Sequence, residues 1–273
     1  MTGPRPPKTE TQADFMLQAS PRPCLGERFD VETLIGSGGM GLVFRCFDRV
    51  DGRLVAVKVL QHREHIASER FAREAQVLAS LVHPAIVRYV AHGTTLGGEP
   101  YLAMEWLDGE TLADRLGRGP LGPRATAQLG ARVLGALAAA HAHGIVHRDI
   151  KPSNLFLPDG DLERAKLLDF GIARRAHASP LTRPGGMVGT PAYMAPEQLR
   201  DGTEVDGRAD VFGLGCVLCE CLTGESPRFT VELDRPARDL DRAHPADAAT
   251  RVARAVARRA RQHARACARG SPG

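Results

Sequence analysis

The chain carries four polar residues whose types and spacing suit the transfer of a phosphoryl group. Asp149, Lys151 and Asn154 lie in the run HRDIKPSN at 147–154, and Asp169 begins the later triplet DFG. This chemistry needs a carboxylate that accepts a hydroxyl proton, a cation beside the moving group, and oxygen ligands that hold Mg²⁺ on the phosphates. Asp149 can act as the base and Lys151 can supply the cation. Asn154 and Asp169 offer the oxygen ligands for the metal ion.

A glycine-rich segment lies upstream, at 35–41, between two runs that alternate apolar and polar side chains. These runs, 29–34 and 42–48, predict two β-strands. Glycine lets backbone N–H groups approach phosphate oxygens where a Cβ atom would obstruct them. A dinucleotide-binding segment of similar composition must open a helix, so the two flanking strands argue against that alternative.

Lys58 is an isolated cation inside the β-rich run 54–60. Such a charge is costly among apolar neighbours unless a carboxylate and phosphates receive it. Glu74 is the candidate carboxylate, and it lies in the run 68–81, which has the periodicity of a helix. The alternative is a surface glutamate paired within the helix with Arg70, a contact worth about 0.3 kcal/mol.

Together these motifs resemble those of the bacterial eukaryotic-type (Hanks-type) serine/threonine protein kinases, and the resemblance covers residues 27–227. It implies an α+β, two-lobed fold with a small β-rich N-terminal lobe and a larger helical C-terminal lobe that lacks its last helices. It also implies ATP as the phosphoryl donor, Mg²⁺ or Mn²⁺ as the cation, and proteins with Ser or Thr acceptors as substrates.

The resemblance also implies the role of each site residue. Asp149, Lys151, Lys58 and Glu74 would be catalytic, with Asp149 as the base, and Asn154 and Asp169 would bind the metal ion. Met104 would be the gatekeeper, while backbone groups of Glu105 and Leu107 would bind the adenine edge. The full set of implied ATP-binding residues is Ile35, Gly36, Ser37, Gly38, Gly39, Met40, Gly41, Val43, Ala56, Lys58, Met104, Glu105, Leu107 and Phe156.

Three further expectations concern the loops around the base. The resemblance implies that His147 packs beneath the Phe170 ring and that Asp210 holds the backbone of the HRD loop. Arg148 should receive a phosphate on the activation loop, 173–196, with Thr182 as the first choice of acceptor. Ser179 is the second choice, and Thr190 is expected to act structurally by bracing Asp149 and Lys151.

Composition sets the class of protein. With 273 residues and 43% hydrophobic residues, the chain can fill two lobes around a real core. No apolar run is long enough to cross a bilayer, and the proline-rich start lacks the features of a secretion signal, so we expect a cytoplasmic protein. Six cysteines without paired metal-ligand spacing favour buried free thiols over a zinc site.

The resemblance ends near Pro227, and the tail, 228–273, differs from the rest of the chain. It holds eleven Arg against five Asp and Glu, a charge of +6, which leaves −2 for the other 227 residues. Large apolar residues are too few there for the three helices that a complete kinase would add. We therefore expect a truncated or frame-shifted lobe, with Glu197 lacking its usual arginine partner and with self-association through the uncovered helix at 211–222.

These observations divide the chain into a disordered leader, 1–26, an N-terminal lobe and hinge, 27–107, a partial C-terminal lobe, 108–227, and the atypical tail. The arginines of the tail could instead bind nucleic acid or anionic lipid. No aromatic residues interleave with them to stack on bases, and the apolar face is too thin for firm membrane insertion, so both alternatives are disfavoured. The runner-up function for the whole chain is a weakly active or inactive nucleotide-binding scaffold, a pseudokinase.

Overall fold

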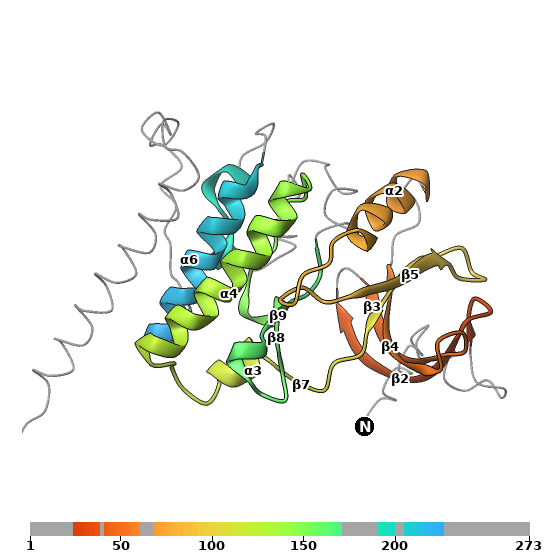
Figure 1. Ribbon diagram of the computed structural model, residues 1–273, viewed down its shortest axis with the longest axis horizontal. Helices are drawn as coiled ribbons and strands as arrows, with labels where there is room; N and C mark the ends of the chain where they lie inside the picture. The colour runs from red at the N-terminus through yellow and green to blue at the C-terminus, as the bar shows by residue number, and fades with distance from the viewer. Residues whose placement is uncertain (1–23, 39–40, 61–67, 171–190, 200–204, 227–273) are drawn as a thin grey trace, which may run out of the picture. The chain divides into compact units, whose positions relative to one another are not determined.

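The computed structural model describes residues 24–38, 41–60, 68–170, 191–199 and 205–226. The chain divides into two compact units (Figure 1). The first, here called the β unit, comprises 1–79 and 88–106, and the second, the helical unit, comprises 80–87 and 107–273. Residues 80–87 therefore group with the helical unit, although they fall inside the range expected for the N-terminal lobe.

The β unit is built on a six-stranded antiparallel sheet with the strand order β1-β2-β3-β4-β6-β5. Its strands are β1 (Cys24–Leu25), β2 (Phe29–Gly38), β3 (Gly41–Asp48), β4 (Arg53–Leu60), β5 (Tyr89–Thr94) and β6 (Pro100–Glu105). The strands predicted at 29–34 and 42–48 are β2 and β3. Strand β2 begins at the predicted residue and continues to Gly38, and β3 begins one residue earlier than predicted and ends at the predicted residue.

One face of this sheet carries the hydrophobic core. Phe29, Phe44, Val55, Val57 and Ala103 are all fully buried there. The alternation of β4 explains the arrangement, because successive side chains of a strand point to opposite faces. The core therefore takes the odd-numbered valines of β4 and leaves its even-numbered residues for the other face.

The core also corrects the expected length of the leader. Residues 24 and 25 fall inside the predicted disordered leader, yet they form β1 and pair with β2. The side chain of Leu25 is 0% exposed within the core, so its burial holds this strand in place. Cys24 and Leu25 are therefore part of the ordered sheet.

Helix α2 (Ser68–Ala79) packs against β5 and β6. Phe71, Ala75 and Leu78 are buried, at the i, i+4, i+7 spacing that one helix face presents. The Phe71 ring lies edge-on to the imidazole of His92, with 6.1 Å between ring centroids. The helix predicted for 68–81 is therefore present and ends two residues earlier.

The helical unit contains three described helices and a small sheet of order β7-β8-β9. The helices are α3 (Leu112–Leu116), α4 (Pro123–Ala142) and α6 (Gly207–Thr223), and the strands are β7 (Gly109–Thr111), β8 (Leu155–Pro158) and β9 (Lys166–Leu167). Four short 3₁₀ helices are η2 (Pro152–Asn154), η3 (Leu162–Arg164), η4 (Pro191–Tyr193) and η5 (Pro196–Leu199).

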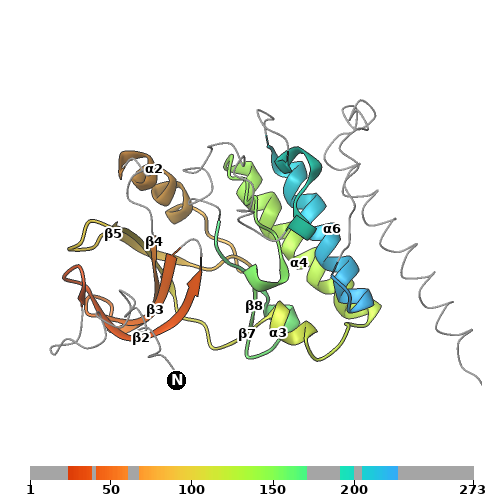
Figure 2. The same cartoon turned by 180° about the vertical axis from the view of Figure 1, so that it is seen from behind.

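Helices α4 and α6 lie side by side, as both ribbon views show (Figures 1 and 2). Gly130 of α4 makes room for Leu218 of α6, because a Cβ atom at Gly130 would lie 3.0 Å from the Leu218 side chain. Asp206 caps the start of α6 by accepting from the Arg208 N–H, and Gly224 ends the helix in a left-handed conformation, φ 73°. The pair forms the core of the helical unit.

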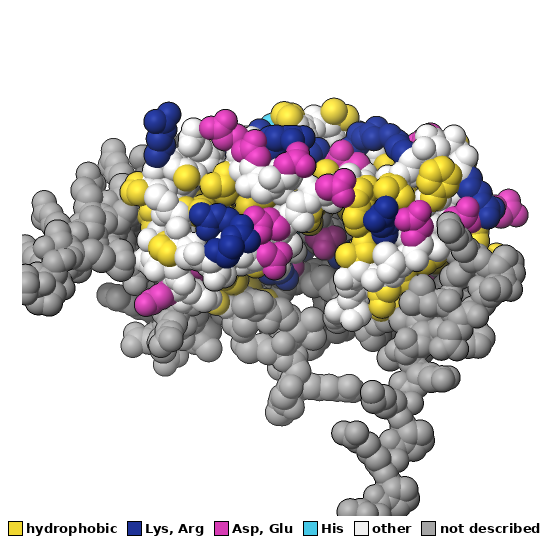
Figure 3. All heavy atoms as spheres, turned by 90° about the horizontal axis from the view of Figure 1, so that it is seen from below, with side chains coloured by type: hydrophobic (Ala, Val, Ile, Leu, Met, Phe, Trp, Pro, Cys, Tyr) yellow, Lys and Arg dark blue, Asp and Glu magenta, His cyan; other side chains and the backbone are white. Residues whose placement is uncertain are grey.

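Charged side chains of both signs lie close to one another on the face shown in Figure 3. Each unit contains such pairs, for example Arg28 with Asp48 in the β unit and Arg118 with Glu110 in the helical unit. The five described cysteines are free thiols, and burial raises the pKa of Cys46, Cys216 and Cys221 to about 12. No helix in the described parts of the chain is both long and apolar enough to cross a membrane.

Candidate active site

The face of the sheet opposite the core gathers several of the predicted nucleotide-binding residues. Lys58 pairs with Val43 on one side and Leu102 on the other, and Ala56 pairs with Met104. Directly paired residues of antiparallel strands project to the same face. Val43, Ala56, Lys58 and Met104 therefore share one face, on which all but the buried Met104 are partly exposed.

The glycine-rich segment forms the end of the β2–β3 hairpin. Gly36 pairs with Val43 and so belongs to the same face, while Gly38 pairs with Gly41. Ile35 and Ser37 are exposed at this end of β2. Gly39 and Met40 lie outside the described residues.

Gly41 is required by the sheet itself. Its φ is +141°, and a Cβ atom there would lie 2.1 Å from the carbonyl oxygen of Val59. The sequence attributed every glycine of this segment to phosphate approach. At Gly41 the structure shows a different cause, the close passage of β4, which any side chain would block.

Glu74, the predicted partner of Lys58, lies in α2 between Phe71 and Leu78. Its side chain is outside the described part of the structure, so the ion pair with Lys58 stays a prediction. The last residue of β6, Glu105, is bonded to Arg88 on the chain just before β5. The Glu105 N–H donates to the Arg88 carbonyl (2.9 Å), and the Glu105 carboxylate accepts from the Arg88 N–H (2.7 Å). These reciprocal bonds fix the backbone where adenine recognition was predicted, two residues before Leu107.

In the helical unit, the predicted base is held by its two predicted neighbours. Asp149 Oδ2 accepts hydrogen bonds from Lys151 Nζ (2.8 Å) and from Asn154 Nδ2 (2.9 Å). Asn154 Nδ2 also donates to the Asp149 carbonyl oxygen (2.7 Å). The carboxylate is 10% exposed, so it is oriented from two sides in a largely buried setting.

The two predicted metal ligands lie next to each other at the ends of paired strands. Leu155 of β8 pairs with Leu167 of β9, and the Leu168 N–H donates to the Asn154 carbonyl oxygen (2.9 Å). Asn154 therefore stands beside Leu168, and Asp169 follows directly. Phe156, the predicted floor of the adenine site, is half-buried on β8.

This donor set fits Mg²⁺. Asn154 uses Nδ2 for both bonds to Asp149, so Oδ1 is the amide atom that can face a cation. Asp169 adds a carboxylate. Mg²⁺ takes oxygen ligands and is often held by one or two side chains together with phosphates and water. The described residues contain no group of three or more His, Cys, Asp or Glu that could hold a metal ion.

His147 has a structural setting, as the sequence predicted. It is fully buried, and its ring lies 4.8 Å from that of Phe170 between centroids. Nε2 donates to the Leu168 carbonyl oxygen (2.6 Å), and Nδ1 accepts from the Asp149 N–H (3.3 Å). Both ring nitrogens are thus used to fix the two loops that carry Asp149 and Asp169.

Asp210 anchors the catalytic loop from α6, which confirms that expectation. Its carboxylate is buried and accepts from the backbone N–H groups of His147 (2.8 Å) and Arg148 (2.7 Å). Gly213, one turn further along, lets α6 approach the loop, because a Cβ atom there would lie 3.1 Å from Ile150 Cβ and 3.2 Å from its carbonyl oxygen. The loop therefore rests directly on the helix.

Comparison with known proteins agrees with this geometry. The profile of the family described as "Protein kinase domain" matches residues 29–263. The chain belongs to the protein kinase domain family. The match continues past Pro227, where the sequence motifs end, and includes part of the tail.

The curated relatives of this kinase domain include bacterial serine/threonine-protein kinases. PknB of Mycolicibacterium smegmatis is 42% identical over 214 residues, pkn2 of Myxococcus xanthus is 42% identical over 210, and PknL of Mycobacterium tuberculosis is 42% identical over 208. Each alignment covers 74% of this chain but only 33%, 25% and 51% of the relative. The chain thus spans between a quarter and about half of the length of these proteins.

Solved structures show the same fold for the kinase domain. The PknI kinase domain of Mycobacterium tuberculosis has a TM-score of 0.60 at 29% identity, over 81% of this chain and 90% of that one. Rad53 1–466 in complex with AMP-PNP has a TM-score of 0.62 at 29% identity, over 75% of this chain and 51% of that one. The β unit and the helical unit are the two lobes of the protein kinase fold.

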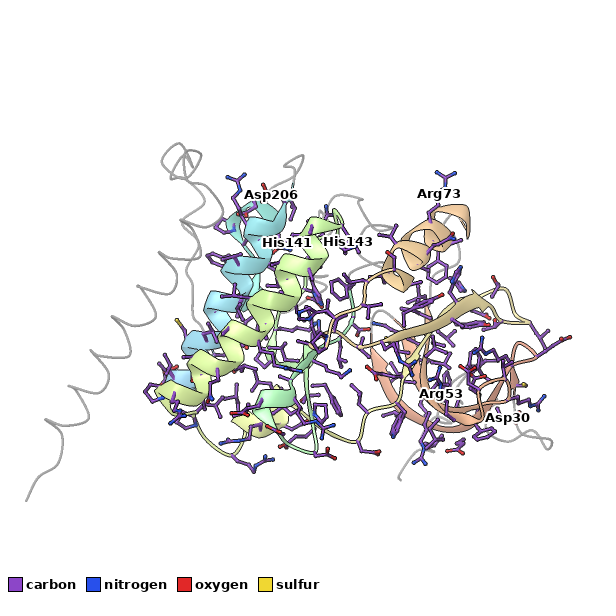
Figure 4. The ribbon with its side chains drawn as sticks, in the orientation of Figure 1. Asp30, Arg53, Arg73, His141, His143 and Asp206 are labelled. Atoms are coloured by element: carbon purple, nitrogen blue, oxygen red, sulfur yellow. The ribbon has the colours of Figure 1, made fainter. Side chains whose placement is uncertain are left out.

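Two residues of the kinase domain escaped the sequence analysis. His141, at the end of α4, places Nε2 2.8 Å from Asp210 Oδ2, so the anchor carboxylate has a third partner. Figure 4 shows His141 at this end of α4, near Asp206 at the start of α6. Gln198 of η5 donates from Nε2 to the Arg148 carbonyl oxygen (2.8 Å). In the sequence, His141 and Gln198 were marked only as polar residues close to a motif.

Ser179, Thr182 and Thr190 lie outside the described residues, as does the tail. Glu197 has no ion-pair partner among the residues that the structure describes, and because the tail lies outside them, the lack of an arginine partner stays a prediction. Tyr193 of η4 donates from its hydroxyl group to the Glu220 carboxylate of α6 (2.5 Å). Burial is the larger cause and this hydrogen bond the smaller cause that raise the pKa of the Tyr193 hydroxyl group.

Proposed function

We propose that this kinase domain transfers the γ-phosphoryl group of ATP to Ser or Thr hydroxyl groups of proteins and phosphorylates its own activation loop. The observation that carries the proposal is the arrangement around Asp149, whose carboxylate receives Lys151 and Asn154 at 2.8 and 2.9 Å. A carboxylate fixed in this way can accept the proton of an incoming hydroxyl group. General-base assistance of this kind supplies about 10²- to 10⁴-fold in rate.

ATP is the expected donor. In the β unit, the sheet face shared by Val43, Ala56, Lys58 and Met104 would bind the nucleotide. Phe156, on β8 of the helical unit, stays a predicted ATP-binding residue. Support comes from Rad53, a structural relative that was solved in complex with AMP-PNP. Lys58 would bind the phosphates, with Glu74 orienting its ammonium group.

Asn154 Oδ1 and the Asp169 carboxylate would hold Mg²⁺, with Mn²⁺ as an alternative. The ion supplies positive charge across the phosphates when it is bound. Lys151 keeps the Asp149 carboxylate in place and can also stabilise the negative charge that develops on the transferred group. Positioning and charge stabilisation by these residues would then account for most of the remaining acceleration.

Arg148 would bind a phosphate on Thr182 or Ser179, which would make autophosphorylation a switch for the loop. Protein substrates with Ser or Thr acceptors, self-association through the apolar side of α6, and a cytoplasmic location stay predictions from the sequence. So do the domain boundaries and the truncated or frame-shifted nature of the tail.

The test is Mg²⁺-dependent transfer of phosphate to dephosphorylated casein by the whole chain and its Asp169→Asn variant. Asp159→Asn is a matched control, because Asp159 (φ 55°) and Asp169 (φ 49°) share a left-handed backbone, while Asp159 is exposed and paired with Arg164. We expect Asp169→Asn to lose about 100-fold or more in rate and Asp159→Asn to keep the rate. Equal rates for all three proteins would contradict the proposed metal site.

A further inference from the structure

The peptide group between Arg148 and Asp149 is held at both of its polar ends. Its N–H donates to His147 Nδ1 (3.3 Å), and its carbonyl oxygen accepts from Gln198 Nε2 (2.8 Å). A peptide group is planar, so two such bonds fix how the plane is turned about the chain. The Cα atom of Asp149 is the last atom of this plane, so the plane sets the direction of the Asp149 side chain.

The plane needs support because the residue before it is in a rare conformation. Arg148 has φ +65°, a region that residues with a side chain seldom occupy and that the surroundings must maintain. Asp210 holds the N–H on the near side of Arg148 (2.7 Å). Gln198 is the side chain that holds the carbonyl group on the far side.

The amide of Gln198 is itself oriented. Its Oε1 accepts from the Ala195 N–H (3.0 Å), and the Gln198 N–H donates to the Ala195 carbonyl oxygen (2.9 Å). A backbone N–H can only donate and a carbonyl oxygen can only accept, so these partners permit one orientation of the amide. The bonds to Ala195 therefore orient the Gln198 Nε2 donor toward the Arg148 carbonyl group.

We infer that Gln198 is a positioning residue for phosphoryl transfer, which acts by holding the Arg148–Asp149 peptide group and with it the base Asp149. The inference rests on the proposed function for its kinetic consequence. Gln198 joins η5, directly after the activation loop, to the catalytic loop, because its bond partner Arg148 lies 50 residues earlier in the chain. A purely structural role would instead confine the effect of Gln198 to the stability of η5.

Gln198→Glu separates the two bonds. Glutamate keeps an oxygen that can accept from the Ala195 N–H but loses the donor to the Arg148 carbonyl group. Gln198→Met removes both bonds at similar size and serves as a second variant if the new charge unfolds the protein. The matched control is Gln128→Glu, on the surface of α4, where Nε2 donates to Glu163 (3.0 Å).

The experiment measures kcat and KM for ATP with Mg-ATP and dephosphorylated casein, together with hydrogen–deuterium exchange of the peptide that covers 145–152, all on the whole chain. We expect kcat to fall about tenfold or more in both Gln198 variants, with KM for ATP within about twofold, since misplacing a reacting group costs rate more than nucleotide binding. Exchange at Asp149 should be faster in both, and Gln128→Glu should match the unmodified chain.

If the unmodified chain transfers phosphate and both Gln198 variants keep kcat within about twofold, the inference is wrong. If the unmodified chain transfers none, the proposed function fails, and the exchange data alone decide. Faster exchange at 145–152 in the Gln198 variants but not in Gln128→Glu would then support the positioning role, and unchanged exchange would overturn it.

Discussion

Asp210 holds Arg148 in a left-handed backbone conformation: its Oδ1 accepts from the Arg148 N–H at 2.7 Å, and φ of Arg148 is +65°. The same carboxylate accepts from the His147 N–H and lies 2.8 Å from His141 Nε2. A buried carboxylate is costly unless it is fully hydrogen-bonded. Here the bonds compensate that cost and fix the loop in which Asp149 lies.

Asp210→Asn should destabilise the protein by about 3 kcal/mol, because one oxygen becomes an NH₂ group that faces donors. Urea unfolding measures the loss. Asp206→Asn is the control on the same helix, since asparagine caps a helix start as well as aspartate does, and its cost should stay within a few tenths of a kcal/mol. Similar stabilities for the two variants would show that Asp210 is not an anchor.

His141→Ala should cost about 1 to 2 kcal/mol through the lost bond to Asp210. His143→Ala should cost less than about 0.5 kcal/mol, because the His143 side chain is exposed and hydrogen-bonds the Ala139 carbonyl group of the helix that it ends. Thermal or urea unfolding of the two variants separates these cases. An equal loss for both would assign no special role to His141.

Gly213→Ala should destabilise by about 1 to 3 kcal/mol, since the new methyl group meets Ile150 at 3.1 to 3.2 Å. Gly135→Ala is the matched change on α4, where the nearest side chain, His83, would be 3.7 Å away. Replacing that glycine should stabilise the helix by about 0.5 to 1 kcal/mol. The opposite signs, measured by urea unfolding, test whether α6 and the catalytic loop are in tight contact.

The stability of the β unit should depend on pH through Asp48. The Arg28 guanidinium donates two hydrogen bonds to this buried carboxylate (2.8 and 2.7 Å), and they hold the pKa of Asp48 below its ordinary value, although burial acts in the opposite direction. A carboxyl group with a lowered folded-state pKa contributes stability above its unfolded-state pKa, about 3.9, and loses the contribution as pH falls through the folded-state value.

Asp48→Asn should therefore cost about 1 to 3 kcal/mol at pH 7, and its deficit relative to the unmodified chain should shrink at and below about pH 4. Other carboxylates titrate equally in both proteins, so the difference in unfolding free energy isolates Asp48. A deficit that stays constant between pH 7 and pH 3 would contradict the lowered pKa.

Local patterns were sufficient for much of this fold and site. The β-rich run 54–60 predicted a strand, and the observed strand register places Lys58 on one face with Ala56 and Met104. The resemblance to the kinase family predicted the contact between His147 and Phe170 and the anchor at Asp210. These features depend on residues that are close in sequence or tied to a recognisable motif.

What the sequence missed depends on distant partners. His141 and Asp210 are 69 residues apart in the sequence. Gln198 donates to a backbone carbonyl group, and every residue has such a group, so the pattern of side chains cannot indicate this partner. The two-residue strand at Cys24–Leu25 is too short for any periodicity. Gly41 was predicted from a phosphate motif, but the neighbouring strand requires glycine there for a steric reason.

The proposed phosphoryl transfer is tested by incubating the purified chain and its Asp149→Asn variant with Mg-ATP and mapping the phosphate by mass spectrometry. We expect phosphate on Thr182 or Ser179 of the unmodified chain, and none on Asp149→Asn, whose amide can accept no proton. Absence of phosphate on folded protein, or equal phosphate on both proteins, would contradict it. The first of these results would favour a nucleotide-binding scaffold without transferase activity.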